Sequence, residues 1–274
     1  MGDVRVIEVK QSVFADNDRK ADELRATLRE RGTFLLNLMS SPGSGKTTTL
    51  MRTIEALKDE LNIAVMEADI DSDVDARTIL DTGVRAIQLH TGGMCHLDAY
   101  MTEQGLDELV RGAAEAAHAD AVAGDAVEAG AECPAGSTDE EAVASSAVPV
   151  KAAGTGDPAG ASVDLAILEN VGNLVCPAEF DTGASANAMI LSVPEGDDKP
   201  LKYPLMFSIC DVVLVNKIDA LPVFDTFSME RVRESILMRN PNATIIPISA
   251  KTGEGIDEWA DWLRAQVAAW KASA

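Results

Sequence analysis

The stretch from Leu35 to Leu50, LLNLMSSPGSGKTTTL, constrains the fold of this chain of 274 residues more than any other. An apolar run typical of a buried strand meets a loop of small residues, and a segment with helical periodicity follows. Strand, glycine-containing loop and helix in this order form a cradle for phosphate. Loop amides turn inward there, and the helix N-terminus is the positive end of a dipole. The strict pattern has a glycine where this chain has Ser40.

The loop assigns roles to its residues. Lys46 is expected to reach the β- and γ-phosphates of a nucleotide, and the Thr47 hydroxyl is expected to bind Mg²⁺. The residues predicted to surround the phosphates are Gly43, Ser44, Gly45, Lys46, Thr47 and Thr48.

Apolar runs alternate with helical segments along the rest of the chain. This alternation predicts an α/β fold with a doubly wound, mainly parallel sheet covered on both faces. We expect strands at 33–39, 62–69, 86–90, 164–170, 211–217 and 244–250. We expect helices at 16–31, 48–61, 73–80, from near 96 to 114, between the later strands, and at 255–272.

The domain organisation predicted is a single nucleotide-binding domain over 1–274, with a helical extension at 1–32 and an insertion at 112–162. The insertion is rich in Ala, Gly, Ser and acidic residues and contains no aromatic residue, leucine or isoleucine. Such a composition buries too little apolar area to offset chain entropy, so we expect a flexible segment. Its first part can extend the preceding helix, because alanine is a good helix former.

Charge and cysteine usage exclude several classes of protein. With 45 acidic and 23 basic residues the net charge is −22, which repels nucleic acid. No apolar run reaches the length of about 18 residues that a membrane span needs, and the first residues contain no secretory signal. The four cysteines are far apart and form no disulfide framework, which fits a reduced cytoplasmic setting.

Two later motifs indicate which base the nucleotide carries. The motif NKID, from Asn216 to Asp219, follows an apolar strand, and an Asp there can accept the N1–H and the exocyclic amine of guanine. The motif SAKTGEG, starting at Ser249, can supply a backbone N–H to the guanine O6. Both motifs follow strands, where open α/β sheets bind ligands. GTP is the predicted nucleotide, with base contacts from Asn216, Lys217, Asp219, Ser249, Ala250 and Lys251.

Acidic residues at strand ends are candidates for the chemistry. Glu169 lies at the end of a strand, three residues before Gly172, where a sensor of the γ-phosphate and Mg²⁺ is expected. Thr47 and Glu169 are therefore the expected Mg²⁺ shell. Asp69 and Asp75 are candidates for outer-shell contact or for positioning water, and the sequence does not separate these roles. The predicted catalytic residues are Lys46, Asp69, Asp75 and Glu169.

A third pattern concerns a soft metal. Cys95 and His96 are adjacent at a strand-to-helix turn, and thiolate and imidazole suit Zn²⁺ and Ni²⁺. The alternative is a buried cysteine beside a histidine that caps a helix. Cys176, four residues after Gly172, favours the metal site because it places a soft ligand next to a nucleotide switch.

Six motifs together resemble the HypB family, the accessory GTPases of [NiFe]-hydrogenase maturation. They are SSPGSGKTT, EADIDSDVDA, GGMCHLDA, ENVGNLVCP, NKID and SAKTGEG. The resemblance implies a P-loop GTPase of the nucleotide-dimerised class and a nickel or zinc site from Cys95, His96 and Cys176, shared across a GTP-dependent homodimer. It also implies a role in nickel insertion, with the hydrogenase large-subunit precursor and a nickel-binding accessory protein as partners.

The sequence departs from the family pattern in two places and leaves two alternatives open. The N-terminal residues hold no cysteine or histidine for a nickel store, and the insertion at 112–162 is not part of the pattern. One alternative is a urease-type accessory GTPase, although that family uses Cys-Pro-His where this chain has Cys-His-Leu-Asp. The other is a nickel or zinc storage protein with a nucleotide fold, which three histidines do not favour.

Overall fold

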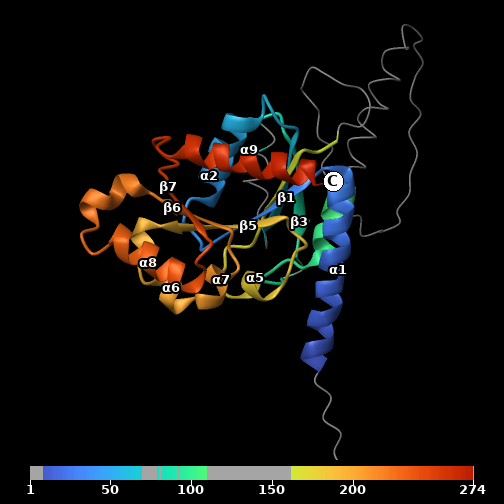
Figure 1. Ribbon diagram of the computed structural model, residues 1–274, viewed down its shortest axis with the longest axis horizontal. Coiled ribbons are helices and arrows are strands. Elements are labelled where there is room, and N and C mark those ends of the chain that lie inside the picture. The colour runs from blue at the N-terminus through green and yellow to red at the C-terminus, as the bar shows by residue number, and fades with distance from the viewer. Residues whose placement is uncertain (1–8, 70–78, 80–81, 92, 110–161, 274) are drawn as a thin grey trace, which may run out of the picture.

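The computed structural model describes residues 9–69, 79, 82–91, 93–109 and 162–273, which form a seven-stranded sheet with helices on both faces (Figure 1). The strand order is β3-β2-β4-β1-β5-β6-β7, and every neighbouring pair is parallel. The strands are β1 (Phe34–Ser40), β2 (Ile63–Asp69), β3 (Arg85–His90), β4 (Leu165–Glu169), β5 (Ala186–Ser192), β6 (Val212–Asn216) and β7 (Thr244–Pro247).

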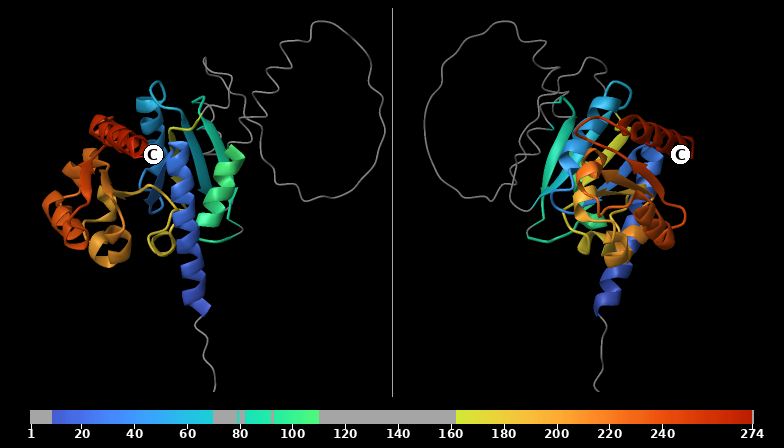
Figure 2. Two further views of the ribbon diagram at one scale, coloured as in Figure 1. Left: turned by 45° about the vertical axis from the view of Figure 1, so that its right-hand side comes forward. Right: turned by 90° about the vertical axis from the view of Figure 1, so that its left-hand side faces the viewer.

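Helices connect these strands and extend the chain at both ends (Figure 2). The α-helices are α1 (Val9–Arg31), α2 (Lys46–Leu57), α5 (Cys176–Glu179), α6 (Lys199–Lys202), α7 (Pro204–Ser208), α8 (Met229–Arg239) and α9 (Ile256–Ala272), with a further helix over 99–109. The two short 3₁₀ helices are η1 (Val193–Glu195) and η2 (Ile218–Val223).

The core lies in two layers on either side of the sheet, and β1 shows why. Phe34, Leu36 and Leu38 pack on one face with α2 and α9. Leu35 and Met39 point to the other face, because successive side chains of a strand alternate. There, α1 and the helix 99–109 cover the β2–β4 part, and α7 and α8 cover the β5–β7 part. All seven residues of β1 are buried, as a strand covered on both faces requires.

The predicted doubly wound parallel fold is confirmed, but one of its strands escaped the sequence analysis. The six expected strands are present with small changes at their ends, whereas β5 (Ala186–Ser192) lies in a segment where we expected helices. Its sequence, ANAMILS, contains a single β-branched residue, and Ala, Met and Leu favour helices. Pairing with β1 and β6 overrides this local preference.

The helix boundaries differ from the expected ones at the N-terminus. Helix α1 begins at Val9 rather than near residue 16, and the helix expected from residue 96 begins at 99. The expected helix 73–80 lies outside the described residues except for Ile79, and the segment 112–162 lies outside them except for Ser162. Of the helices that the structure describes, none combines the length and apolar character that crossing a membrane would need.

Candidate functional site

The phosphate loop joins β1 to α2 in a shape that requires glycine. Gly43 and Gly45 have φ angles of +75° and +95°, in the left-handed region that L side chains rarely adopt. A Cβ atom at Gly45 would lie 2.5 Å from the Asn216 amide nitrogen, so the NKID motif also requires glycine at this position. The loop closes at the N-terminus of α2, whose first amides have no partner within the helix and can bind an anion.

A cavity of about 470 Å³ lies at the carboxyl ends of the central strands, over this loop. It is lined by Ser40, Ser41, Pro42, Gly43, Gly45, Lys46, Thr47, Thr48, Glu67, Ala68, Glu169, Gly172 and Lys217. Most of the predicted phosphate residues therefore line one cavity, together with the predicted Mg²⁺ residues Thr47 and Glu169. Ser44 is fully buried behind the loop, where its carbonyl accepts a hydrogen bond from the Asn216 side chain at 2.9 Å.

Lys46 connects the loop to the next strand end. Its Nζ donates to the main-chain oxygen of Asn170 at 2.7 Å and lies 3.6 Å from Oε1 of Glu169. The side chain is 15% exposed, so the ammonium group lies at the cavity rather than in open solvent. The lysine thus contacts the segment in which a γ-phosphate sensor was expected.

A second buried carboxylate, Glu67, belongs to this cavity and was missed by the sequence analysis. Glu67 in β2 is in register with Glu169 in β4, and each residue is 3% exposed. Side chains in register on adjacent parallel strands share a face, so the two carboxylates lie on the same side of the sheet. The cavity combines a cationic phosphate loop with an acidic floor, which suits a nucleotide that carries Mg²⁺. An acid inside the apolar run AVMEAD was the available signal.

The structure does not describe the side chains of the two aspartates predicted near Mg²⁺. Asp69 is the last residue of β2, and its side chain is not among those described. Asp75 lies outside the described residues. Their roles in Mg²⁺ contact or water positioning stay predictions.

The base motifs are joined to the phosphate loop through Asn216, which is 1% exposed at the end of β6. Its amide nitrogen donates to the Ser44 carbonyl, and its Oδ1 accepts the backbone N–H groups of Lys217 at 2.7 Å and Ala250 at 3.1 Å. Lys217 has a φ of 64°, a strained value for a residue with a side chain, and its Nζ donates to the Gly43 carbonyl at 2.6 Å. Asn216 therefore connects the phosphate loop, the NKID motif and the SAK loop.

Asp219 and the SAK loop are in direct contact beside the expected position of the base. Ser249 is buried, and its hydroxyl donates to Oδ1 of Asp219 at 2.7 Å. This contact orients the carboxylate, which is otherwise exposed at the mouth of the site. Arg52 of α2 holds the SAK loop from behind, since its Nε donates to the Ala250 carbonyl at 3.0 Å. Lys251 is exposed on the same loop.

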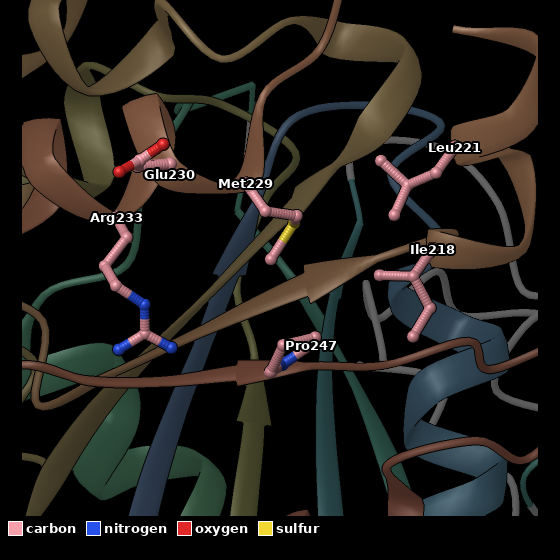
Figure 3. A pocket seen from close by; sticks show the side chains of 6 residues that line it. All are labelled: Ile218, Leu221, Met229, Glu230, Arg233 and Pro247. Atoms are coloured by element: carbon pink, nitrogen blue, oxygen red, sulfur yellow. The ribbon is translucent and has the colours of Figure 1, made fainter. Parts of the chain in front are cut away.

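A second cavity, of about 440 Å³, lies on the other side of η2. Figure 3 shows the side chains of Ile218 and Leu221 reaching toward Met229 and Pro247, with Glu230 and Arg233 completing the lining. Four of its six lining residues are apolar, and although the first turn of α8 contributes Met229 and Glu230, the lining contains no glycine-rich turn and no lysine. The cavity on the phosphate loop is therefore the candidate nucleotide site.

Two of the three predicted soft-metal ligands meet in the structure. The Sγ atoms of Cys95 and Cys176 lie 2.7 Å apart, although the residues are 81 positions apart in the chain. Both are free cysteines and half-buried. The hydrogen bond with Cys95, together with burial, raises the pKa of the Cys176 thiol. A bound divalent ion would reverse that effect, because a coordinating thiol gives up its proton.

His96 does not join the two thiols. Its ring stacks on Phe180, with centroids 3.8 Å apart and planes at 11°, and burial lowers the pKa of the imidazole. Its Nδ1 is buried without a hydrogen-bond partner among the described residues. Across that same part of the chain, no group of three or more cysteine, histidine or acidic side chains is arranged to hold a metal ion.

The segment from Glu169 to Cys176 connects the nucleotide cavity with the thiol pair. Gly172 lies against Pro42 of the phosphate loop, where an added Cβ would come within 3.4 Å of the proline ring. Asn173 then accepts the backbone N–H groups of Val175 at 2.8 Å and of Cys176 at 3.3 Å. This Asx turn fixes the main chain that carries the thiol, and the sequence analysis did not single it out.

Cavity, loop and base motifs define a P-loop nucleotide-binding protein of the α/β class. In a comparison with protein families, the family model described as CobW/HypB/UreG, nucleotide-binding domain, matches residues 34–247 of this chain. The chain is 42% identical over 277 residues to the hydrogenase maturation factor HypB of Cupriavidus necator, across 100% of this chain and 73% of that protein. It therefore belongs to the HypB family, as the motifs predicted.

Two further relatives extend this comparison. The hydrogenase/urease maturation factor HypB of Helicobacter hepaticus is 37% identical over 257 residues, covering 94% of this chain and 86% of its own length. The crystal structure of HypB from Helicobacter pylori in complex with nickel is similar with a TM-score of 0.69 and 34% identity. That match covers 92% of this chain and 95% of that chain.

Proposed function

We propose that the protein is a GTP-hydrolysing metallochaperone that binds nickel, or zinc, and assists nickel insertion into a [NiFe]-hydrogenase. The observation that carries this proposal is the segment 169–176. It begins at the nucleotide cavity, where Lys46 donates to the Asn170 carbonyl, and it ends at Cys176, 2.7 Å from Cys95. At most about 3.5 Å per residue separates the two ends of this segment along the chain, so it is a short covalent link through which a change at the phosphate end can reach the thiol end.

The chemistry of the nucleotide end follows from its residues. The loop amides and Lys46 would stabilise negative charge on the β- and γ-phosphates, since these donors are already directed at the cavity. Thr47 and Glu169, with Glu67 beside them, would hold Mg²⁺, which supplies charge neutralisation between the phosphates. Asp219, oriented by Ser249, would accept both guanine donors.

The soft-metal end requires more donors than the described residues of one chain bring together. Two thiols form half of a four-coordinate site, so a second protomer that adds its own pair would complete it. The exposed apolar side chains of Met94 and Val175, 40% and 52% exposed, each precede one of the two cysteines. A homodimer formed when GTP binds would cover them, and His96 would join by leaving its stack on Phe180. Nickel in this scheme is cargo, and thiols kept reduced fit a cytoplasmic location.

The names of the relatives indicate the target. A hydrogenase maturation factor and a hydrogenase/urease maturation factor are both similar to this chain over nearly its whole length. We propose a hydrogenase large-subunit precursor as acceptor and a nickel-binding accessory protein as a further partner. The second name keeps delivery to urease as an alternative.

The test is a nickel titration of the purified protein in two nucleotide states. We expect the affinity with a non-hydrolysable GTP analogue to differ from that with GDP by about fivefold or more, the usual range of such coupling. The pH must be fixed, because protons compete with the metal for thiolate ligands, and the pKa of the Cys176 thiol is raised. By linkage, nickel must change the affinity for the analogue relative to GDP by the same factor. Equal nickel affinity in the two states would contradict the proposal.

A further inference from the structure

The two segments that carry Cys95 and Cys176 have no backbone hydrogen bond to each other among those found between the described loops and turns. They meet on the flank of α1, which lies beside the helix 99–109 in Figure 2. One side chain of α1, Asn17, contacts both segments. We propose that Asn17 is a positioning residue that holds the two thiols together, an inference that rests on the proposed metal function of the pair.

Asn17 forms one hydrogen bond to each segment. Its Oδ1 accepts the backbone N–H of Ala99 at 3.0 Å, and its Nδ2 donates to the Asp181 carbonyl at 2.9 Å. Ala99 is four residues after Cys95, and Asp181 is five residues after Cys176. The side chain is 4% exposed, so water does not replace either bond readily.

The bond to Ala99 has a specific physical role. Ala99 is the first residue of its helix, and its N–H is one of the amides that a helix leaves without an internal partner. Asp98 caps the same helix by accepting the N–H of Met101 at 2.9 Å. Asn17 therefore accepts the Ala99 N–H, which the Asp98 cap does not bind. This bond fixes the start of the helix that follows Cys95 and His96.

Neighbouring residues of α1 strengthen the contact to the second segment. The Arg25 guanidinium binds the Asp181 carboxylate, and its Nε donates to the Ala184 carbonyl at 3.0 Å. At the other end, the Phe14 ring lies 5.0 Å from the ring of Phe180, which stacks on His96. Asn17 lies between these contacts along α1, and its side chain hydrogen-bonds to both segments.

The consequence for the metal is a preorganised donor pair. Two thiols on separate loops must be brought together each time an ion binds, and the ordering cost lowers affinity unless the fold has already met it. Side chains outside the coordination shell typically change metal affinity by about 10- to 100-fold. We expect the loss of metal affinity in Asn17→Ala to lie near tenfold, at the lower end of this range, because Asn17 acts through the backbone of the two segments.

The experiment uses two readouts on the full chain in a Cys133→Ser background. The first is closure of the Cys95–Cys176 disulfide by oxidised glutathione. In that reaction the two thiols lose two hydrogens and two molecules of reduced glutathione form, and intact mass reports the product in the monomer. The second readout is Ni²⁺ affinity. In Asn17→Ala we expect about tenfold slower closure and about tenfold weaker Ni²⁺ binding, with GTP affinity within about twofold of the parent.

Two further variants control for general effects on α1. Lys20→Ala, also in α1, removes an ion pair of 2.6 Å to Glu103 of the helix 99–109 without touching residues 180–184, and should match the parent protein in both readouts. Asn17→Asp keeps the size and the acceptor for Ala99 but loses the donor to Asp181, so it should behave like Asn17→Ala. It also serves as the test if the alanine variant does not fold.

The outcomes separate this inference from the proposed function. If a folded Asn17 variant formed the Cys95–Cys176 disulfide as fast as the parent protein, or bound Ni²⁺ as tightly, the positioning role would be overturned. A parent protein that binds no Ni²⁺ through these thiols, while closure still slows in Asn17→Ala, would overturn the proposed function and leave the positioning of the thiols supported.

Discussion

Two regions of the molecule are held in place by different kinds of contact. The nucleotide end comprises the phosphate loop with the NKID and SAK loops, and the thiol end comprises the two segments that carry Cys95 and Cys176. At the nucleotide end the loops are braced by one another: Asn216 joins the phosphate loop to the SAK loop, and Lys217 returns to Gly43. At the thiol end, Cys95 contacts Cys176 and His96 stacks on Phe180, and the segments that carry these residues are anchored to α1 through Asn17.

This difference indicates which end can change shape. A site braced by its own buried contacts keeps its geometry when a ligand leaves, whereas a site anchored from one side can be rearranged by whatever covers it. The nucleotide end is thus built to recognise a fixed shape. Under the proposed function, the thiol end is the part that a second protomer would complete.

The largest expected effect tests the nucleotide end alone. Lys46→Ala removes the lysine of the phosphate loop from the cavity, and we expect GTP turnover to fall about 100-fold or more with the fold retained. Lys58→Ala, at the exposed C-terminal end of the same helix, should leave turnover unchanged. Single-turnover phosphate release with circular dichroism measures both. Normal turnover in folded Lys46→Ala would remove the phosphate loop from the mechanism.

Base recognition should show the next largest effect. In Asp219→Asn an amide donor replaces one carboxylate oxygen, so GTP affinity should fall by about tenfold to a hundredfold, and preference should shift toward xanthosine triphosphate. Competition binding with the two nucleotides measures the change. Asp225→Asn, an exposed acid just beyond η2, is the matched control. If the Asp219 variant kept full preference for GTP, guanine would have to be read elsewhere.

The two ends are separated most directly by Cys176→Ala. Removing one of the two thiols should weaken nickel binding by about tenfold or more and abolish its dependence on nucleotide, while GTP affinity stays within about twofold. Nickel titrations in the GDP and GTP-analogue states measure this, with Cys133→Ser as a thiol control. A large loss of GTP affinity in Cys176→Ala would show that the two ends form one site.

The smallest effect is expected from the insertion. Deleting residues 120–160 should leave GTP turnover within about twofold, since the composition of this segment predicts little burial. Turnover and thermal midpoint of the deletion variant are the measurements, together with proteolysis of the intact chain. Loss of folding would show that the segment contributes to one of the two ends.

The sequence predicted the nucleotide end better than the thiol end for a physical reason. Lys46, Asn216 and Asp219 belong to short motifs whose spacing reflects local turns, so neighbours in the chain are neighbours in space. Asn17 acts on segments 82 and 164 positions away, and no local pattern records such a contact. Glu67 and β5 were missed because burial and strand pairing, which are long-range, outweigh local preference.

The hydrogen bond from Lys46 to the Asn170 carbonyl gives the ammonium group an internal ligand. An ammonium group has three donors, so a phosphate can bind Lys46 while this backbone oxygen keeps its place. The carbonyl then holds the lysine at the end of β4 with or without nucleotide. Because the ligand is a peptide group, no side-chain substitution at residue 170 removes it. The strength of this internal ligand is tuned only by whatever moves the strand end that presents it.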